Sequence, residues 1–180
     1  DEAVGELNDR VEQHSLGYEV TGGKIVVKTN RHAHKNIVKP VMLFLQDKEF
    51  SGAEEEFFKA FDFLKQKDYK NSIVEVAKSF ESVLKIICKG MGYSFDNEKD
   101  TAKKLVEILK KNKFFPSYLD CQMSTVCNLL ESGVPTIRNK TSGHGQGTEK
   151  VFVSMEYAEY AINLVASNII FLVKLYQKNK

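Results

Sequence analysis

The residues best suited to chemistry lie in one short segment, residues 138–144, which reads Arg-Asn-Lys-Thr-Ser-Gly-His. A histidine titrates near neutral pH and can move protons, and the fork of an arginine matches the oxygens of a phosphate. Glycines in and around the segment let the backbone approach a ligand closely. These residue types fit the cleavage of RNA, which requires proton transfers and stabilisation of charge on the phosphorane.

Each polar residue of the segment has an expected role in such a reaction. His144 would act as general base or acid, and Arg138 would stabilise the phosphorane. Asn139 would orient the histidine or hold the phosphate, while Lys140 and Ser142 would contact the RNA backbone. None of these roles needs a metal ion or another cofactor. By composition alone, a solvated surface loop is the simpler interpretation.

The stretches that surround this segment show the period of an α-helix, with apolar residues at spacings of three and four. The expected helices cover residues 32–46, 51–64, 69–89, 100–111, 116–131 and 154–176. Pro40 marks a first turn or a kink of the first of them. Ser51 and Glu54 have the spacing of a capping box, and Gly90 and Gly92 are expected to end the longest helix. Long amphipathic helices with short connections predict a mainly α-helical bundle.

The first 30 residues depart from this pattern. Residues 1–15 look like the tail of a polar helix, and residues 17–28 alternate apolar and polar side chains around Gly22-Gly23. That alternation predicts a short β-hairpin. We therefore expect an N-terminal part, residues 1–30, and a helical bundle, residues 31–180. Because the first residue is Asp rather than Met, we interpret residues 1–30 as the end of a missing upstream part.

Composition is typical of one compact domain: 180 residues, 42% apolar and 28% charged, with a formal charge of +2. This near-neutral charge argues against wholesale binding to a polyanion but permits a local basic site. Three cysteines without CxxC spacing, with Cys88 expected as a buried thiol, indicate a reducing cytoplasm rather than disulfides or zinc. No membrane association is expected, because four polar residues interrupt the last apolar stretch: Glu159, Asn163, Asn168 and Lys174.

Three other groups of residues have simpler explanations than a functional site. His32 and His34 could bind a metal, but no Cys or acidic partner stands at ligand spacing, so a solvated helix start is preferred. The lysines of residues 103–104 and 110–113 predict a solvated face, with contact to an RNA backbone as the alternative. Four phenylalanines follow the helical period and are expected in the core rather than as a base-stacking platform: Phe57, Phe58, Phe61 and Phe63.

The chemistry-bearing segment also resembles a known family. Arg138-Asn139 followed by His144 matches the R-x(4–6)-H motif of the HEPN superfamily, in which a polar residue follows the arginine. The wider stretch 130–147 is similar to the C-terminal domain of abortive-infection proteins, one HEPN branch. Residues 77–85, 101–105 and 158–173 are similar to other helices of that domain. The resemblance covers residues 35–177, while the hairpin lies outside it.

The resemblance implies a HEPN-like helical bundle, preceded here by the short hairpin, that forms a homodimer with two motifs in one cleft. It implies a metal-independent endoribonuclease that serves as a toxin or antiviral effector in phage defence. Carried over by position, Arg138 and His144 are the catalytic pair and Asn139 is the polar accessory. An antitoxin or an upstream domain would be a further partner.

Four other residues are expected to contact the substrate. Lys140, Ser142 and Gln146 belong to the stretch that resembles the family, and they would hold the RNA. Glu81 lies on the long helix, where relatives can place an acidic residue that faces the motif. A solvated or ion-paired glutamate is an equally acceptable interpretation of Glu81.

Two other functions stay open. The chain would be a non-catalytic HEPN module if it bound RNA or a nucleotide, or only dimerised, while an upstream domain carried the activity. It would be an inert helical interaction protein if it had no affinity for RNA and tolerated changes in residues 138–144.

Overall fold

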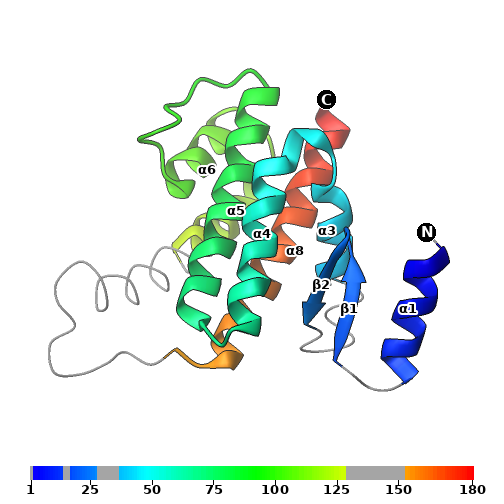
Figure 1. The fold of residues 1–180 in the computed structure, drawn as a ribbon. Coiled ribbons are helices and arrows are strands. Elements are labelled where there is room, and N and C mark those ends of the chain that lie inside the picture. The colour runs from blue at the N-terminus through cyan, green and yellow to red at the C-terminus, as the bar shows by residue number, and fades with distance from the viewer. Residues whose placement is uncertain (1, 14–16, 28–36, 129–152) are drawn as a thin grey trace, which may run out of the picture.

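The computed structural model of the chain describes residues 2–13, 17–27, 37–128 and 153–180 (Figure 1). The described part is a helical bundle with one small antiparallel hairpin, which confirms the expected fold class. Before the bundle come α1 (Glu2–Gln13), β1 (Tyr18–Thr21) and β2 (Lys24–Val27). The bundle consists of α3 (Lys39–Leu45), η2 (Lys48–Phe50), α4 (Ser51–Lys65), α5 (Tyr69–Gly90), α6 (Ala102–Lys111), η3 (Ser117–Leu119), a helical stretch at 120–128, and α8 (Met155–Asn179).

Helices α4 and α5 are held together by hydrogen bonds as well as by apolar packing. The buried hydroxyls of Ser72 and Ser79 on α5 donate to the backbone carbonyls of Ala60 and Ala53 on α4, each at 2.7 Å. All four side chains are small, so the two helix backbones can approach closely. The core prediction for α4 is confirmed, because Phe57, Phe58 and Phe61 are buried, while Phe63 is half-buried.

Helix α8 supplies a continuous strip of the core and packs against α3, α4 and α5. Although polar residues interrupt it, its length and composition would suffice to cross a membrane. A core helix meets the same criterion, and the buried residues run along its whole length, so we interpret α8 as a core helix. These residues are Ala158, Ala161, Ile162, Val165, Ala166, Ile169, Leu172, Val173 and Tyr176.

The C-terminal end of α8 is tied to the region before α4. The hydroxyl of Tyr176, which is 1% exposed, donates to one carboxylate oxygen of Glu49 at 2.5 Å. The ammonium group of Lys180 lies 3.2 Å from the other oxygen. The ring of Tyr176 also lies against Gly90, where a Cβ atom would overlap the hydroxyl oxygen. Gly90 is the last residue of α5, as predicted, and it is also a position where Tyr176 leaves no room for a side chain.

Three helices end in the same backbone arrangement, a Schellman motif. At the end of α6, the amide of Lys113 donates to the carbonyl of Lys110, and the next amide donates to the carbonyl of Leu109. The residue in the left-handed conformation is usually glycine, because glycine has no Cβ atom to clash. Gly92 takes this position after α5, with φ of 73°. Lysines take it after α4 and α6, with φ of 61° at Lys67 and 53° at Lys113.

The start of α4 differs from the prediction. Ser51 and Glu54 were expected to form a capping box, but Ser51 is already the first residue of the helix, and no side chain caps it. The reason is that η2 runs directly into α4, so the chain turns earlier than the capping pattern suggests. The side chain of Asp47 caps η2 instead and accepts the amide of Glu49 at 3.2 Å. Pro40 lies in the first turn of α3, in agreement with one of its two expected positions.

The predicted hairpin is present, and polar contacts connect it to α3 on one side and to α1 on the other. Gly22 and Gly23, both at positive φ, make the turn. On the bundle side, the carboxylate of Glu19 is 7% exposed and lies 2.7 Å from the ammonium group of Lys39. On the outer edge of β1, the side chain of Asn8 from α1 exchanges two hydrogen bonds with the backbone of Val20, at 2.7 and 2.8 Å. These contacts join α1, the hairpin and α3 in one chain of interactions.

Candidate functional site

The segment that the sequence singles out lies outside the described residues, which end at 128 and resume at 153. The roles assigned to it therefore remain predictions. The same holds for the H-x-H pair at residues 32 and 34. The residues concerned in the segment are Arg138, Asn139, Lys140, Ser142, His144 and Gln146.

The chain is anchored to the core on both sides of this gap. Before it, Met123 and Cys127 of the helical stretch 120–128 are buried in the bundle core. After it, Val153 packs against the same core, and the hydroxyl of Ser154 accepts the amide of Tyr157 at 3.3 Å. This hydrogen bond caps α8 at its N-terminus and fixes where the helix begins.

Two exposed tyrosines lie on the first two turns of α8. Tyr157 is 37% exposed and Tyr160 is 51% exposed, and their rings stack with centroids 6.3 Å apart. Exposed aromatic rings can stack on unpaired bases of RNA. The sequence analysis missed this pair because it considered only the wide apolar stripe of the helix, which was expected to face the core. The available signal was an aromatic pair three residues apart that falls outside that stripe.

Two acidic side chains stand beside these tyrosines. Burial raises the pKa of Glu159 above its usual value, and the nearby charge of Glu156 raises this pKa further. A hydrogen bond from the Ser154 side chain lowers the pKa of Glu156, which is exposed and ionised. The negative charge disfavours a phosphate at this point, so the surface is better suited to bases than to an RNA backbone.

Glu81 is the one predicted site residue that the structure describes. It lies in the middle of α5, partly exposed, and its carboxylate is 2.9 Å from the ammonium group of Lys85 one turn later. This contact agrees with the second interpretation of Glu81, in which it is an ion-paired glutamate and not a substrate contact. An exposed pair at this spacing contributes only a few tenths of a kcal/mol, about 0.3–0.5.

A second carboxylate near Glu81 was missed by the sequence analysis. Glu56 of α4 accepts a hydrogen bond of 2.6 Å from the hydroxyl of Ser82 on α5. Burial between the helices raises the pKa of Glu56, the Ser82 hydrogen bond opposes that rise, and the charges of Glu75 and Glu81 add to it. The sequence offers no signal for this pair, because Glu56 reads as an ordinary polar position of an amphipathic helix.

The cysteines have structural positions, as expected for Cys88. Cys88 and Cys127 are buried, whereas Cys121 is exposed. Burial raises the pKa of the Cys88 thiol to about 11, with a further contribution from the charge of Asp100. A thiol with such a pKa is almost entirely protonated near neutrality and is unreactive. Among the described residues, no three His, Cys, Asp or Glu side chains are grouped closely enough to hold a metal ion.

We expect a single fast-reacting thiol in the native protein. Cys121 is exposed, whereas the thiolate fraction of Cys88 at pH 8 is about one in a thousand for a pKa of about 11. Titration with a chromogenic disulfide should show one equivalent at once, and three after unfolding in guanidinium chloride. The Cys121→Ser variant should lose the fast phase. Two or more fast thiols in the native chain would contradict the burial of Cys88 and Cys127.

Comparison with known proteins gives one family. The family model for a HEPN-like domain, Abi_C, matches residues 51–176, which run from the start of α4 to near the end of α8. The match covers most of the chain and includes the segment with Arg138 and His144. The elements before α4 lie outside it. No curated protein and no solved structure matches the chain significantly.

Proposed function

The chain belongs to the Abi_C family of HEPN-like domains, which relates it to abortive infection, and we propose that it is a metal-independent endoribonuclease. One observation carries the proposal. The family match spans the only segment of the sequence in which an arginine and a histidine stand at R-x5-H spacing, with a polar residue after the arginine. The residue types supply a complete set of groups for RNA cleavage.

The proposed reaction is an attack within the RNA chain. His144 takes the proton of the 2′-hydroxyl, and the 2′-oxygen forms a bond to phosphorus. The bond from phosphorus to the 5′-oxygen breaks, and the protonated His144 gives its proton to that oxygen. The products are a 2′,3′-cyclic phosphate and a 5′-hydroxyl. Arg138 stabilises the charge of the phosphorane and Asn139 positions the phosphate, in a site that two copies of the chain complete as a homodimer.

Substrate contacts would come from both sides of the reacting phosphate. Lys140, Ser142 and Gln146 would bind the RNA near the cleaved bond. The stacked rings of Tyr157 and Tyr160 support a base contact next to this segment, because they are exposed on the first turns of α8. Glu81 already pairs with Lys85, so a role in holding the substrate would require Glu81 to exchange partners.

The proposal is tested by incubating the purified chain with mixed RNAs and analysing the ends of the fragments. We expect 2′,3′-cyclic phosphate and 5′-hydroxyl ends, and we expect EDTA to leave the rate unchanged. Arg138→Ala and His144→Ala should each abolish cleavage, whereas His32→Ala, a histidine change outside the motif, should not. Inhibition by EDTA, or full activity in both motif variants, would overturn the mechanism.

The same assay identifies the alternative. If the chain binds RNA but produces no cyclic phosphate ends, it is a non-catalytic HEPN module. If it neither binds nor cleaves RNA, an interaction protein is the better description.

A further inference from the structure

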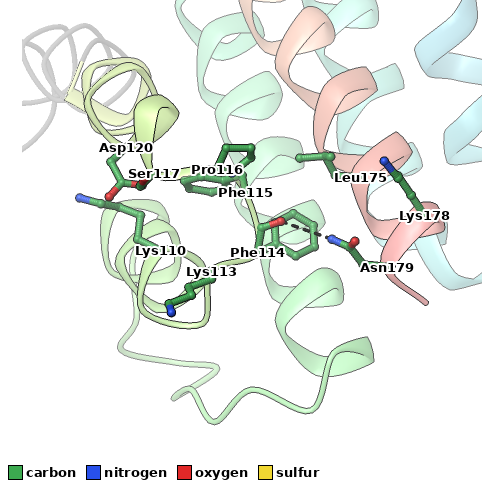
Figure 2. A pocket seen from close by; sticks show the side chains of 10 residues that line it. All are labelled: Lys110, Lys113, Phe114, Phe115, Pro116, Ser117, Asp120, Leu175, Lys178 and Asn179. Atoms are coloured by element: carbon green, nitrogen blue, oxygen red, sulfur yellow. Dashed lines mark hydrogen bonds between the residues drawn. The ribbon is translucent and has the colours of Figure 1, made fainter.

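A second polar site lies at the C-terminal end of α8. A pocket of about 560 Å³ opens between the chain that follows α6 and the last turns of α8 (Figure 2). Helix α8 has 25 residues and is therefore about 37 Å long at a rise of 1.5 Å per residue. The pocket lies at the last residues of α8, at the opposite end of this helix from Tyr157 and Tyr160.

Three lysines line this pocket: Lys110, Lys113 and Lys178. Lys110 is already paired, since its ammonium group lies 3.0 Å from the carboxylate of Glu107. The ammonium groups of Lys113 and Lys178 form no ion pair or hydrogen bond with any described residue, and both side chains are exposed. The lining contains one acidic side chain, Asp120, which lies beside Lys110 (Figure 2). The pocket thus holds two cations without a counter-ion in the described part of the chain.

The two segments that form this pocket carry an excess of positive charge. Residues 101–120 and 160–180 together contain eight of the 26 basic residues but only two of the 24 acidic ones. The rest of the chain is consequently net acidic, although the total charge is +2. A local excess of this kind attracts a polyanion that the average charge of the protein would not.

The backbone conformation of Lys113 has a counterpart elsewhere in the chain. Lys113 occupies the left-handed position of a Schellman motif, where glycine would be less strained. Lys67 occupies the same position after α4, with φ of 61° against 53°, but it lies outside the pocket lining. The two lysines therefore form a matched pair, alike in backbone geometry and different in surroundings.

The rest of the lining favours phosphate over a protein partner. The rings of Phe114 and Phe115 are only 4% and 3% exposed, so they offer no anchor for an apolar side chain. The amide of Asn179 is occupied, because it donates to the carbonyl of Phe114 at 3.3 Å. Pro116, Ser117, Asp120 and Leu175 complete the lining. Its unpaired charged groups are the ammonium groups of Lys113 and Lys178, and such groups bind phosphate as point charges and do not read bases.

We propose that this pocket binds the phosphate backbone of single-stranded RNA, without sequence preference, through Lys113 and Lys178 with support from Lys110. RNA as the ligand rests on the proposed function. Its lining shares no residue with the R-x5-H segment, so the pocket would add a second contact along the RNA. Of the two interpretations of the 110–113 lysines, the backbone contact is therefore the one that we adopt.

The test measures binding of a fluorescein-labelled single-stranded RNA by fluorescence anisotropy over a range of salt concentrations. All chains carry His144→Ala, which slows any cleavage during the measurement, and binding is read even if the chain proves not to be a nuclease. The pocket variant is Lys113→Gly with Lys178→Gln. The matched control is Lys67→Gly with Lys65→Gln, which removes the same charge and relieves the same backbone strain at the end of α4.

We expect the pocket variant to bind RNA about tenfold more weakly and its salt slope to fall by about 1.4, the value for two phosphate contacts on a single strand. The control should keep the slope and affinity of the parent, and changes in RNA sequence should not alter the difference. Equal weakening in both variants, or no weakening in the pocket variant, would overturn the proposal. Loss of binding to polyglutamate, with RNA binding unchanged, would assign the pocket to an acidic protein and also overturn it.

Discussion

Replacing Gly90 by alanine is expected to lower the free energy of unfolding by about 3 kcal/mol, because the added methyl group would overpack the buried ring of Tyr176 and break its charged hydrogen bond. An added Cβ would overlap the hydroxyl and ring of Tyr176, a rigid side chain that is 1% exposed and cannot swing aside. Moving the ring would also break its hydrogen bond to Glu49. The change is measured by urea unfolding followed by circular dichroism.

Two further variants make this result specific. Gly52→Ala is the control, because nothing lies within 4 Å of a Cβ at this exposed position of α4, and alanine favours a helix by about 1 kcal/mol over glycine. In a Tyr176→Leu background, Gly90→Ala should cost much less than in the parent, since the two changes share one contact. If Gly90→Ala proved as harmless as Gly52→Ala, the described packing of Tyr176 would be wrong.

Replacing His144 by alanine is expected to reduce the rate of RNA cleavage by about 10² to 10⁴, the usual contribution of a general acid or base. In cells, expression of the parent chain should stop bacterial growth, and expression of the His144→Ala chain should not. Arg138→Lys should also lose most of the activity, because an ammonium group keeps the charge but cannot grip two phosphate oxygens at once.

The control for this experiment is His32→Ala, which removes a histidine from another part of the chain and should still stop growth. Circular dichroism of each purified variant verifies that the loss of activity does not come from unfolding. Growth arrest by the His144→Ala chain at equal expression would mean that the toxicity has another source.

Much of the fold was predictable because its signals are local. Helix α5, expected at residues 69–89, runs from Tyr69 to Gly90, since one apolar stripe continues without interruption and Asp68 caps its start. The start of α4 was not predictable from Ser51 and Glu54, because η2 had already turned the chain. The left-handed conformations of Lys67 and Lys113 were hidden for a similar reason, since lysine gives no sign of such a backbone.

The same difference between local and long-range signals separates the two candidate sites. The R-x5-H spacing is visible in seven consecutive residues, so the sequence alone leads to Arg138 and His144. The pocket at the end of α8 joins Phe114 and Asn179, which are separated by 65 residues in the chain. No local pattern connects two such segments, and only the packing of α8 along the bundle brings them together.

The place of α8 at the end of the matched domain has a consequence for biosynthesis. A ribosome adds about 5–20 residues per second, so α8 follows the preceding helices only seconds later. Until it has emerged, α3, α4 and α5 lack the apolar strip against which they pack, and Tyr176 cannot reach Glu49. A nascent chain therefore cannot complete its bundle while α8 is still in the exit tunnel. An RNA-cleaving toxin made in this order would assemble only after the messenger that encodes this domain has been translated.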